Sequence, residues 1–176
     1  MQGTPPGSSV LFSVDESEYD TLYIALNLSG YANAYAEVVT LAAPTNISKV
    51  KFFLGKGNYP TGNIYAKLYA VDENHKPTGP ALATSIAVDI STLTSSSSLQ
   101  LVEFTFQGGY SAEAGEMAVI IEYMDGNASN TLRVGAVSSG HSQVDNFYLV
   151  NRVYPESWGY AMIGSQYGGL IFYLYN

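Results

Sequence analysis

The stretch KVKFFLGKGNYPTGNIYAKLYA, residues 49–70, decides the fold class of this chain. Apolar residues occupy every second position on both sides of a turn-rich centre: Val50, Phe52 and Leu54, then Ile64, Ala66, Leu68 and Ala70. A period of two is typical of strands that bury one face, and the central glycines, asparagine and proline favour a turn. The stretch therefore predicts two strands joined as a β-hairpin.

The same alternation recurs along the chain, whereas the i, i+3, i+4 spacing of helices is nearly absent. It is clear at Val102, Phe104 and Phe106, and at Met117, Val119, Ile121 and Tyr123. Further strands are predicted at residues 36–41, 82–90, 132–137, 147–150 and 170–175. Because no crossover helices are available to connect parallel strands, the pattern predicts an all-β, antiparallel two-sheet jelly-roll sandwich. Phe104 and Ile121 are expected in its core.

The chain of 176 residues is long enough for one sizeable core and short for two. We interpret residues 29–176 as the jelly-roll domain and residues 1–28 as an N-terminal arm. The arm has two alternating sets of apolar residues: Val10, Phe12 and Val14, then Leu22, Ile24 and Leu26. A strand with an apolar face must bury it, either at the edge of its own sandwich or on a neighbouring subunit. We expect part of the arm to contact another subunit, and residues 30–176 to fold without it but fail to assemble.

Composition excludes several classes of function. The net charge of −8 disfavours nucleic acid and anionic lipid headgroups, which are usually met by Lys and Arg patches. The lack of cysteine removes disulfides, thiolate metal sites and cysteine nucleophiles, and no apolar run is long enough for a transmembrane helix. The first residues lack the basic and apolar regions of a secretory signal, unless a signal has been removed. Only 12% of the residues are charged and 15 are tyrosines, a composition common in secreted and virion-surface proteins. We expect a protein without cofactors, located on a virion or an extracellular surface.

The two histidines, His75 and His141, both fall in turn-rich segments. His75 is interpreted as a solvated loop residue. His141 follows serines and precedes Asp145, an order that invites comparison with a hydrolase triad. No Gly-x-Ser-x-Gly motif is present, however, and sequence order says nothing about mutual hydrogen bonding. We predict that the protein is not an enzyme and has no catalytic residues.

Two oxygen-rich segments are candidates for binding ions or charged partners. Residues 125–130, Asp-Gly-Asn-Ala-Ser-Asn, carry the oxygen ligands that Ca²⁺ prefers but lack the EF-hand spacing, and the same residue types make ordinary tight turns. The turn is the favoured interpretation, and no metal site is predicted. The acidic cluster Asp15, Glu16, Glu18 and Asp20 is interpreted as a solvated loop, with a basic partner surface as the alternative.

The candidate binding surface lies late in the chain, where aromatic residues are interleaved with polar ones. Its predicted members are Trp158, Tyr154, Tyr160, Tyr167, Asn151 and Arg152. Sugars and protein partners engage such sets, because rings stack on the apolar sugar face while polar side chains bind the hydroxyls. Packing of alternating tyrosines within strands is the competing interpretation. Trp158, the only tryptophan of the chain, is the best single candidate.

From about residue 35 to 175 the order of these signals resembles jelly-roll modules of phage tail-fibre and virion proteins and of bacterial choice-of-anchor surface proteins. The resemblance rests on the segments APTNISKV (43–50), PTGNIYAKLY (60–69), KPTGPALATS (76–85), FTF (104–106), YSAEAGE (110–116) and GLIFYLY (169–175). It implies a sandwich like that of carbohydrate-binding modules and brings no catalytic residue with it. The arm lies outside the match.

Three functions fit these observations. The first is a non-enzymatic virion-surface or appendage protein, which decorates a capsid or forms part of a fibre or adhesin as a homo-oligomer or with other virion proteins. The second is a secreted carbohydrate-binding module that binds a surface glycan. The third is an extracellular filament subunit assembled by strand addition. The first fits the resemblance and the arm best.

Overall fold

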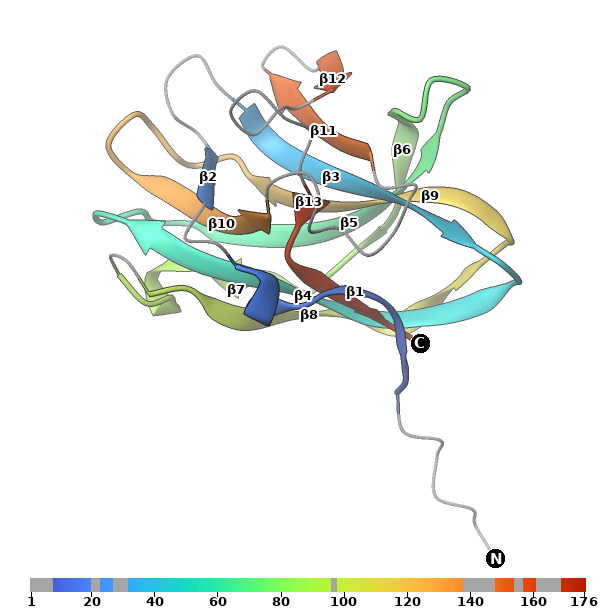
Figure 1. Ribbon diagram of the computed structural model, residues 1–176. Coiled ribbons are helices and arrows are strands. Elements are labelled where there is room, and N and C mark those ends of the chain that lie inside the picture. The colour runs from blue at the N-terminus through green and yellow to red at the C-terminus, as the bar shows by residue number, and fades with distance from the viewer. Residues whose placement is uncertain are drawn as a thin grey trace, which may run out of the picture.

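The computed structural model is an antiparallel sandwich of two β-sheets, so the predicted all-β fold class is confirmed. It describes residues 8–19, 23–26, 32–95, 98–137, 148–153, 157–160 and 169–176, of which residues 148–153 and 160 are described by their backbone alone. Figure 1 shows the two layers, with β3 (Ala32–Leu41), β9 (Gly115–Tyr123) and β11 (Tyr148–Val153) above, and β4 (Thr45–Gly57) and β8 (Gln100–Ala112) below.

The first sheet, called sheet I, is organised around the long strand β4. On one side β4 pairs with β8, and on the other it pairs with β14 (Phe172–Tyr175) and then with β10 (Thr131–Val137). Ile171 lies at the junction, because Phe53 N donates to its carbonyl oxygen and its own N–H donates to Gly135 O. The sheet is completed by β1 (Val10–Val14) beside β14, and by β2 (Tyr23–Leu26) and β13 (Gly169–Leu170) beside β10.

The second sheet, called sheet II, has the strand order β12-β11-β3-β9-β5-β6, with β7 beside β5. Its further strands are β12 (Ser157–Tyr160), β5 (Asn63–Val71), β6 (Pro77–Thr84) and β7 (Val88–Asp89). The strand predicted at residues 82–90 is interrupted between β6 and β7. There Ser85 N donates to Ala66 O in sheet II, and Ile86 N donates to Thr105 O in sheet I, so this short segment bridges the two sheets.

The core lies between the inner faces of the two sheets, where alternate residues of the strands are buried. Sheet I contributes the rings of Phe104, Phe52 and Phe172 from three neighbouring strands. The ring centroids are 6.0 Å apart for Phe52 and Phe104, and 6.2 Å apart for Phe52 and Phe172. Sheet II contributes Ile64 and Ile121, which are fully buried. The prediction that Phe104 and Ile121 belong to the core is therefore confirmed.

The predicted hairpin of residues 49–70 is wrong, although both of its strands exist. β4 belongs to sheet I and β5 to sheet II. The turn between them includes two residues of positive φ, Asn58 at 61° and Gly62 at 92°, and it carries the chain across the sandwich. Gly62 has no room for a side chain, since an added Cβ would lie 2.1 Å from Asp125 Oδ2. The apolar faces of the two strands thus meet across the core instead of lying side by side.

The described part of the N-terminal arm is built into sheet I. β1 pairs with β14, placing Val14 opposite Phe172, and β2 pairs with β10, placing Leu26 opposite Leu132. Figure 1 shows β1, in blue, beside the C-terminal strand. This packing argues against the expectation that residues 30–176 fold without the arm, because removal of β1 and β2 would uncover the edges of β14 and β10. Contact of the arm with another subunit stays a prediction.

The six apolar arm residues differ in burial. Val14 and Leu26 are fully buried, Phe12 and Ile24 are partly buried against the core, Val10 is 49% exposed, and Leu22 lies outside the described residues. The inward face predicted by alternation is therefore present in both strands. The inward residues Phe12, Val14, Ile24 and Leu26 pack against the core of the same chain.

Candidate functional site

The outer face of sheet I carries a group of aromatic and charged side chains that we call the tyrosine–lysine cluster: Lys49, Lys51, Glu103, Tyr173 and Tyr175. Strand register brings them together, with Tyr175 opposite Lys49, Tyr173 opposite Lys51, and Lys51 opposite Glu103. Because alternate residues of these strands, such as Val50 and Phe52, are buried, the cluster faces outward.

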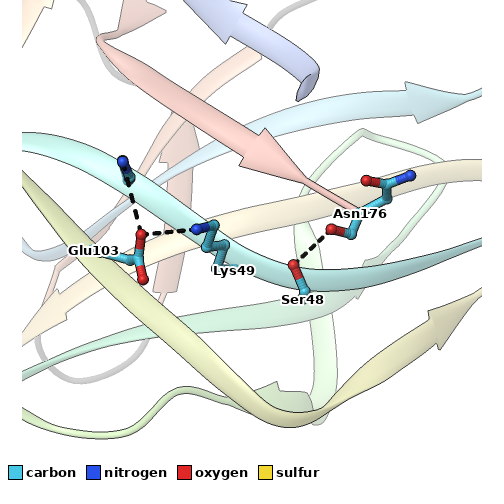
Figure 2. Close-up of polar contacts among 5 residues, drawn as sticks. Ser48, Lys49, Glu103 and Asn176 are labelled. Atoms are coloured by element: carbon cyan, nitrogen blue, oxygen red, sulfur yellow. Dashed lines mark hydrogen bonds and ion pairs between the residues drawn. The ribbon is translucent and has the colours of Figure 1, made fainter. Parts of the chain in front are cut away.

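Cluster side chains contact one another directly. The rings of Tyr173 and Tyr175 are stacked, with centroids 6.4 Å apart and planes 26° apart. The ammonium groups of Lys49 and Lys51 lie 5.2 and 5.6 Å from the Tyr175 ring centroid. Both also approach one carboxylate oxygen, Glu103 Oε2, at 3.0 and 3.7 Å, and Figure 2 shows the contact of Lys49. Exposed pairs of this kind contribute about 0–1 kcal/mol each, so the cluster adds little to stability.

Contacts near both ends of β14 hold the tyrosines in place. Tyr173 Oη donates to Asp15 Oδ2 at 2.7 Å and also contacts Glu16, which fastens the 3₁₀ turn η1 (Glu16–Glu18) onto this face. Burial and these two carboxylates raise the pKa of Tyr173. At the other end, Ser48 Oγ donates to Asn176 O at 2.7 Å (Figure 2). The rings are therefore positioned by the fold before any ligand arrives.

Two members of the predicted acidic cluster thus have a structural role. Asp15 accepts a hydrogen bond from Ser17 N at 2.8 Å, which begins η1, and hydrogen bonds from Ser17 and Tyr173 lower its pKa. Glu18 belongs to the same turn, and Asp20 lies outside the described residues.

Aromatic and cationic groups continue along the outer face beyond the cluster. The rings of Phe53 and Tyr19 form a T-shaped pair, with centroids 5.3 Å apart. The Arg133 guanidinium lies 4.7 Å from the centroid of the Tyr23 ring, which is 43% exposed. Lys49, Lys51 and Arg133 are three of the seven Lys and Arg residues of a chain with net charge −8. The face therefore gathers cations and rings that the sequence spreads over β2, β4, β10 and β14.

The binding surface predicted late in the chain is only partly described. Trp158, on β12, packs against a buried group on sheet II that is separate from the main core and consists of Ala34, Ala36, Val38, Ala118 and Ile120. Backbone register sets Arg152 opposite Trp158, Asn151 opposite Gly159 and Val150 opposite Tyr160, while Tyr154 and Tyr167 lie outside the described residues. The contacts of Trp158 favour the packing interpretation for that residue.

His75 has a defined partner on the surface. It adopts a positive φ of 57° in the turn between β5 and β6, and its Nδ1 lies 2.7 Å from Glu116 Oε2. The turn is closed by Asp72 Oδ1, which accepts hydrogen bonds from Asn74 N and Lys76 N, and the bond from Lys76 is the main cause of a lowered Asp72 pKa. His141 and Asp145 lie outside the described residues.

Replacement of His75 by alanine is expected to change the free energy of unfolding by less than about 1 kcal/mol, because half-exposed ion pairs stabilise little. Chemical denaturation of His75→Ala beside the parent protein measures this. A larger loss would mean that the Glu116 contact has a role that its exposure does not indicate.

Residues 125–130 form the turn that the sequence favoured over a calcium site. Asn127 Oδ1 accepts from Ser129 N at 3.0 Å and from Asn130 N at 3.1 Å, and Asn130 Oδ1 accepts from Tyr59 N at 3.2 Å. These side-chain oxygens are occupied by backbone N–H groups. Within the described ranges, no group of three or more His, Cys, Asp or Glu residues is placed to hold a metal ion.

Fold and surface together define the class: an antiparallel β-sandwich with an aromatic and cationic cluster on the outer face of one sheet. Comparison with protein-family models, with curated proteins and with solved structures finds no match for this chain. No helix in the described part of the chain is long and apolar enough to span a membrane.

Proposed function

We propose that the chain is a non-enzymatic structural and binding module of a virion surface or appendage, which assembles with other subunits and binds a surface glycan. The observation that carries the binding part is the tyrosine–lysine cluster. Two stacked rings and two ammonium groups share the outer face of sheet I, where they contribute little to stability.

The chemistry of the cluster suits a sugar. The apolar face of a pyranose stacks on a tyrosine ring, while hydroxyl groups need donors and acceptors at fixed positions. Lys49 and Lys51 supply donors, and Glu103 supplies acceptors. Because β14 is held at both ends, the rings lose little conformational freedom on binding, which favours affinity.

The assembly part rests on the position of the arm strands. β1 and β2 are the outermost strands on their side of sheet I, and Val10 on β1 is 49% exposed. Edge strands present unpaired backbone groups, through which a second chain can add a strand. The same edge supports the filament subunit as a second candidate function, in which strand addition repeats without closure.

A glycan array tests the binding part. The parent protein is expected to bind at least one glycan, and Tyr175→Ala is expected to weaken that binding about tenfold, equivalent to about 1.4 kcal/mol. Tyr59→Ala is the matched control, because Tyr59 is 90% exposed but lies in the turn beyond the far end of β4. Equal weakening by both variants, or no glycan bound at all, would contradict a sugar site at the cluster.

Light scattering of the parent protein tests the assembly part separately. A virion or filament component is expected to be oligomeric, whereas a secreted carbohydrate-binding module, the remaining candidate, is expected to be a monomer. Glycan binding by a monomer would therefore support the cluster as a sugar site but contradict the virion assignment. The protein would then be interpreted as a secreted carbohydrate-binding module.

A further inference from the structure

A carboxyl group is buried inside the sandwich. Glu37 lies in the middle of β3 and is fully buried. It shares the inner face of the strand with Val39 and Leu41, and its neighbours across sheet II are Val119 on β9 and Leu149 on β11. Burying a carboxylate among apolar groups is costly unless it is paired or stays neutral.

Within the described part of the chain, the Glu37 side chain makes one hydrogen bond, which reaches across to the other sheet. Its Oε1 accepts from Leu170 N on β13. The neighbouring Gly169 allows this approach, because a Cβ added there would lie 3.2 Å from Oε1. Oε2 is buried and has no hydrogen-bond partner among the described residues. The carboxyl therefore holds β13 by one oxygen, while no described residue satisfies the other.

The described surroundings of Glu37 provide no cation. Val119 on β9 lies beside it, the backbone of Leu149 on β11 lies opposite it in register, and β13 contributes Gly169 and Leu170. The titratable side chain on the same face of β3 is Tyr35, whose pKa is raised to about 12 by burial and which therefore stays neutral. Burial raises the pKa of Glu37 from 4.5 to about 8, although the hydrogen bond from Leu170 N opposes this shift.

We propose that Glu37 is a protonation-dependent latch, which holds β13 against sheet II while its carboxyl group is neutral and releases it when the group ionises. β13 is two residues long and leads through Ile171 directly into β14. β14 carries Tyr173 and Tyr175, so opening of the latch loosens the strand that supports the tyrosine–lysine cluster. The latch depends on the fold alone and does not require the proposed function.

The direction of the pH effect follows from linkage. An ordinary glutamate carboxyl in water has a pKa of about 4.5, and burial in the closed state raises the pKa of Glu37 to about 8. The closed state is therefore most stable below about pH 5 and loses stability progressively as the pH rises to about 8. Above pH 8 both states are ionised, and the opening equilibrium stops changing.

Hydrogen exchange of the Leu170 amide tests the latch. Base catalysis raises the exchange rate of an open amide about tenfold per pH unit, and ionisation of Glu37 raises the open fraction by about the same factor. The exchange rate of the Leu170 amide is therefore expected to rise about a hundredfold per pH unit between about pH 5 and 8. In Glu37→Gln, which keeps an acceptor but cannot ionise, the rise is expected to be about tenfold per unit. Glu122→Gln is the matched control, since Glu122 is a buried glutamate of sheet II that pairs with Lys67, and it is expected to keep the hundredfold dependence.

The same pH dependence in the parent and in Glu37→Gln would overturn the latch. If Glu37→Gln does not fold, carbon NMR of the Glu37 carboxyl in the parent protein gives an independent decision. A midpoint near 8 supports the latch, and a midpoint below about 5.5, close to the ordinary glutamate value, overturns it.

Discussion

Deletion of residues 1–28 is expected to abolish the folded sandwich. The deletion removes β1 and β2, which cover the outer edges of β14 and β10. It also removes the fully buried Val14 and Leu26 and the partly buried Phe12, Ile24 and Tyr19. Full burial of such a side chain contributes about 1.5–3 kcal/mol, so the loss approaches the total of about 5–15 kcal/mol that stabilises an ordinary domain.

Circular dichroism and thermal melting of residues 29–176 measure this effect. Point variants separate burial from chain length: Val14→Ser and Leu26→Ser are expected to lower the melting temperature strongly. Val10→Ser and Tyr23→Ser are the controls on the same strands, because their side chains are 49% and 43% exposed, and they are expected to change it little.

A truncated chain that melts like the parent but stays monomeric would restore the interpretation of the arm as a pure assembly element. It would mean that the arm can dock equally well on another subunit. Strand exchange of this kind satisfies the same backbone groups between chains as within one.

Phe104→Ala is expected to lower the free energy of unfolding by about 3–5 kcal/mol, through lost burial and the cavity that remains. Phe104 is fully buried on β8, and its ring meets Phe52 edge to face with planes 71° apart. Phe52 in turn packs on Phe172, so the cavity opens in a row of rings that links β8, β4 and β14. Relaxation around the cavity is restricted, because the central strand β4 is paired with β8 on one side and with β14 on the other.

Equilibrium denaturation of Phe104→Ala gives the free energy directly. Leu101→Ala is the matched control, since Leu101 lies on β8 and is 36% exposed on the opposite face, and a change of no more than about 1 kcal/mol is expected there. Equal effects of the two substitutions would mean that the inner and outer faces of β8 are not distinguished by packing.

Alternation along the sequence predicted the long strands β4, β5, β8 and β9 and the buried residues on their inner faces, but not which strands are neighbours. The period of two predicts inner faces for Phe52 and Ile64, and both are fully buried. The hairpin inferred for the same stretch is wrong, because β4 and β5 lie in different sheets. Two consecutive strands have the same period of two whether they pair within one sheet or pack face to face from opposite sheets. The pattern therefore does not distinguish these two arrangements.

The tyrosine–lysine cluster escaped sequence reasoning for a related reason. Lys49 and Lys51 lie on the polar side of one predicted strand, and Tyr173 and Tyr175 on the outward side of another. Each pair is unremarkable alone, and only the pairing of β14 with β4 brings them within contact. Two aromatic residues on the outward side of a predicted strand were the available signal. Composition alone instead favours Trp158, because it is the only tryptophan of the chain.

The sequence by itself determined the all-β class and the faces of its strands, because side-chain direction in a strand is a local property with a period of two. Only the tertiary structure decided that the arm is built into sheet I and that Glu37 is enclosed. Glu37 occupies an inward position of β3 between Ala36 and Val38. The local sequence does not indicate that Leu170 of the opposite sheet contacts Glu37, or that no cation lies near it among the described residues. Long-range strand pairing depends on which arrangement of strands buries the most apolar surface. That buried area is a property of the whole folded chain and not of any single segment.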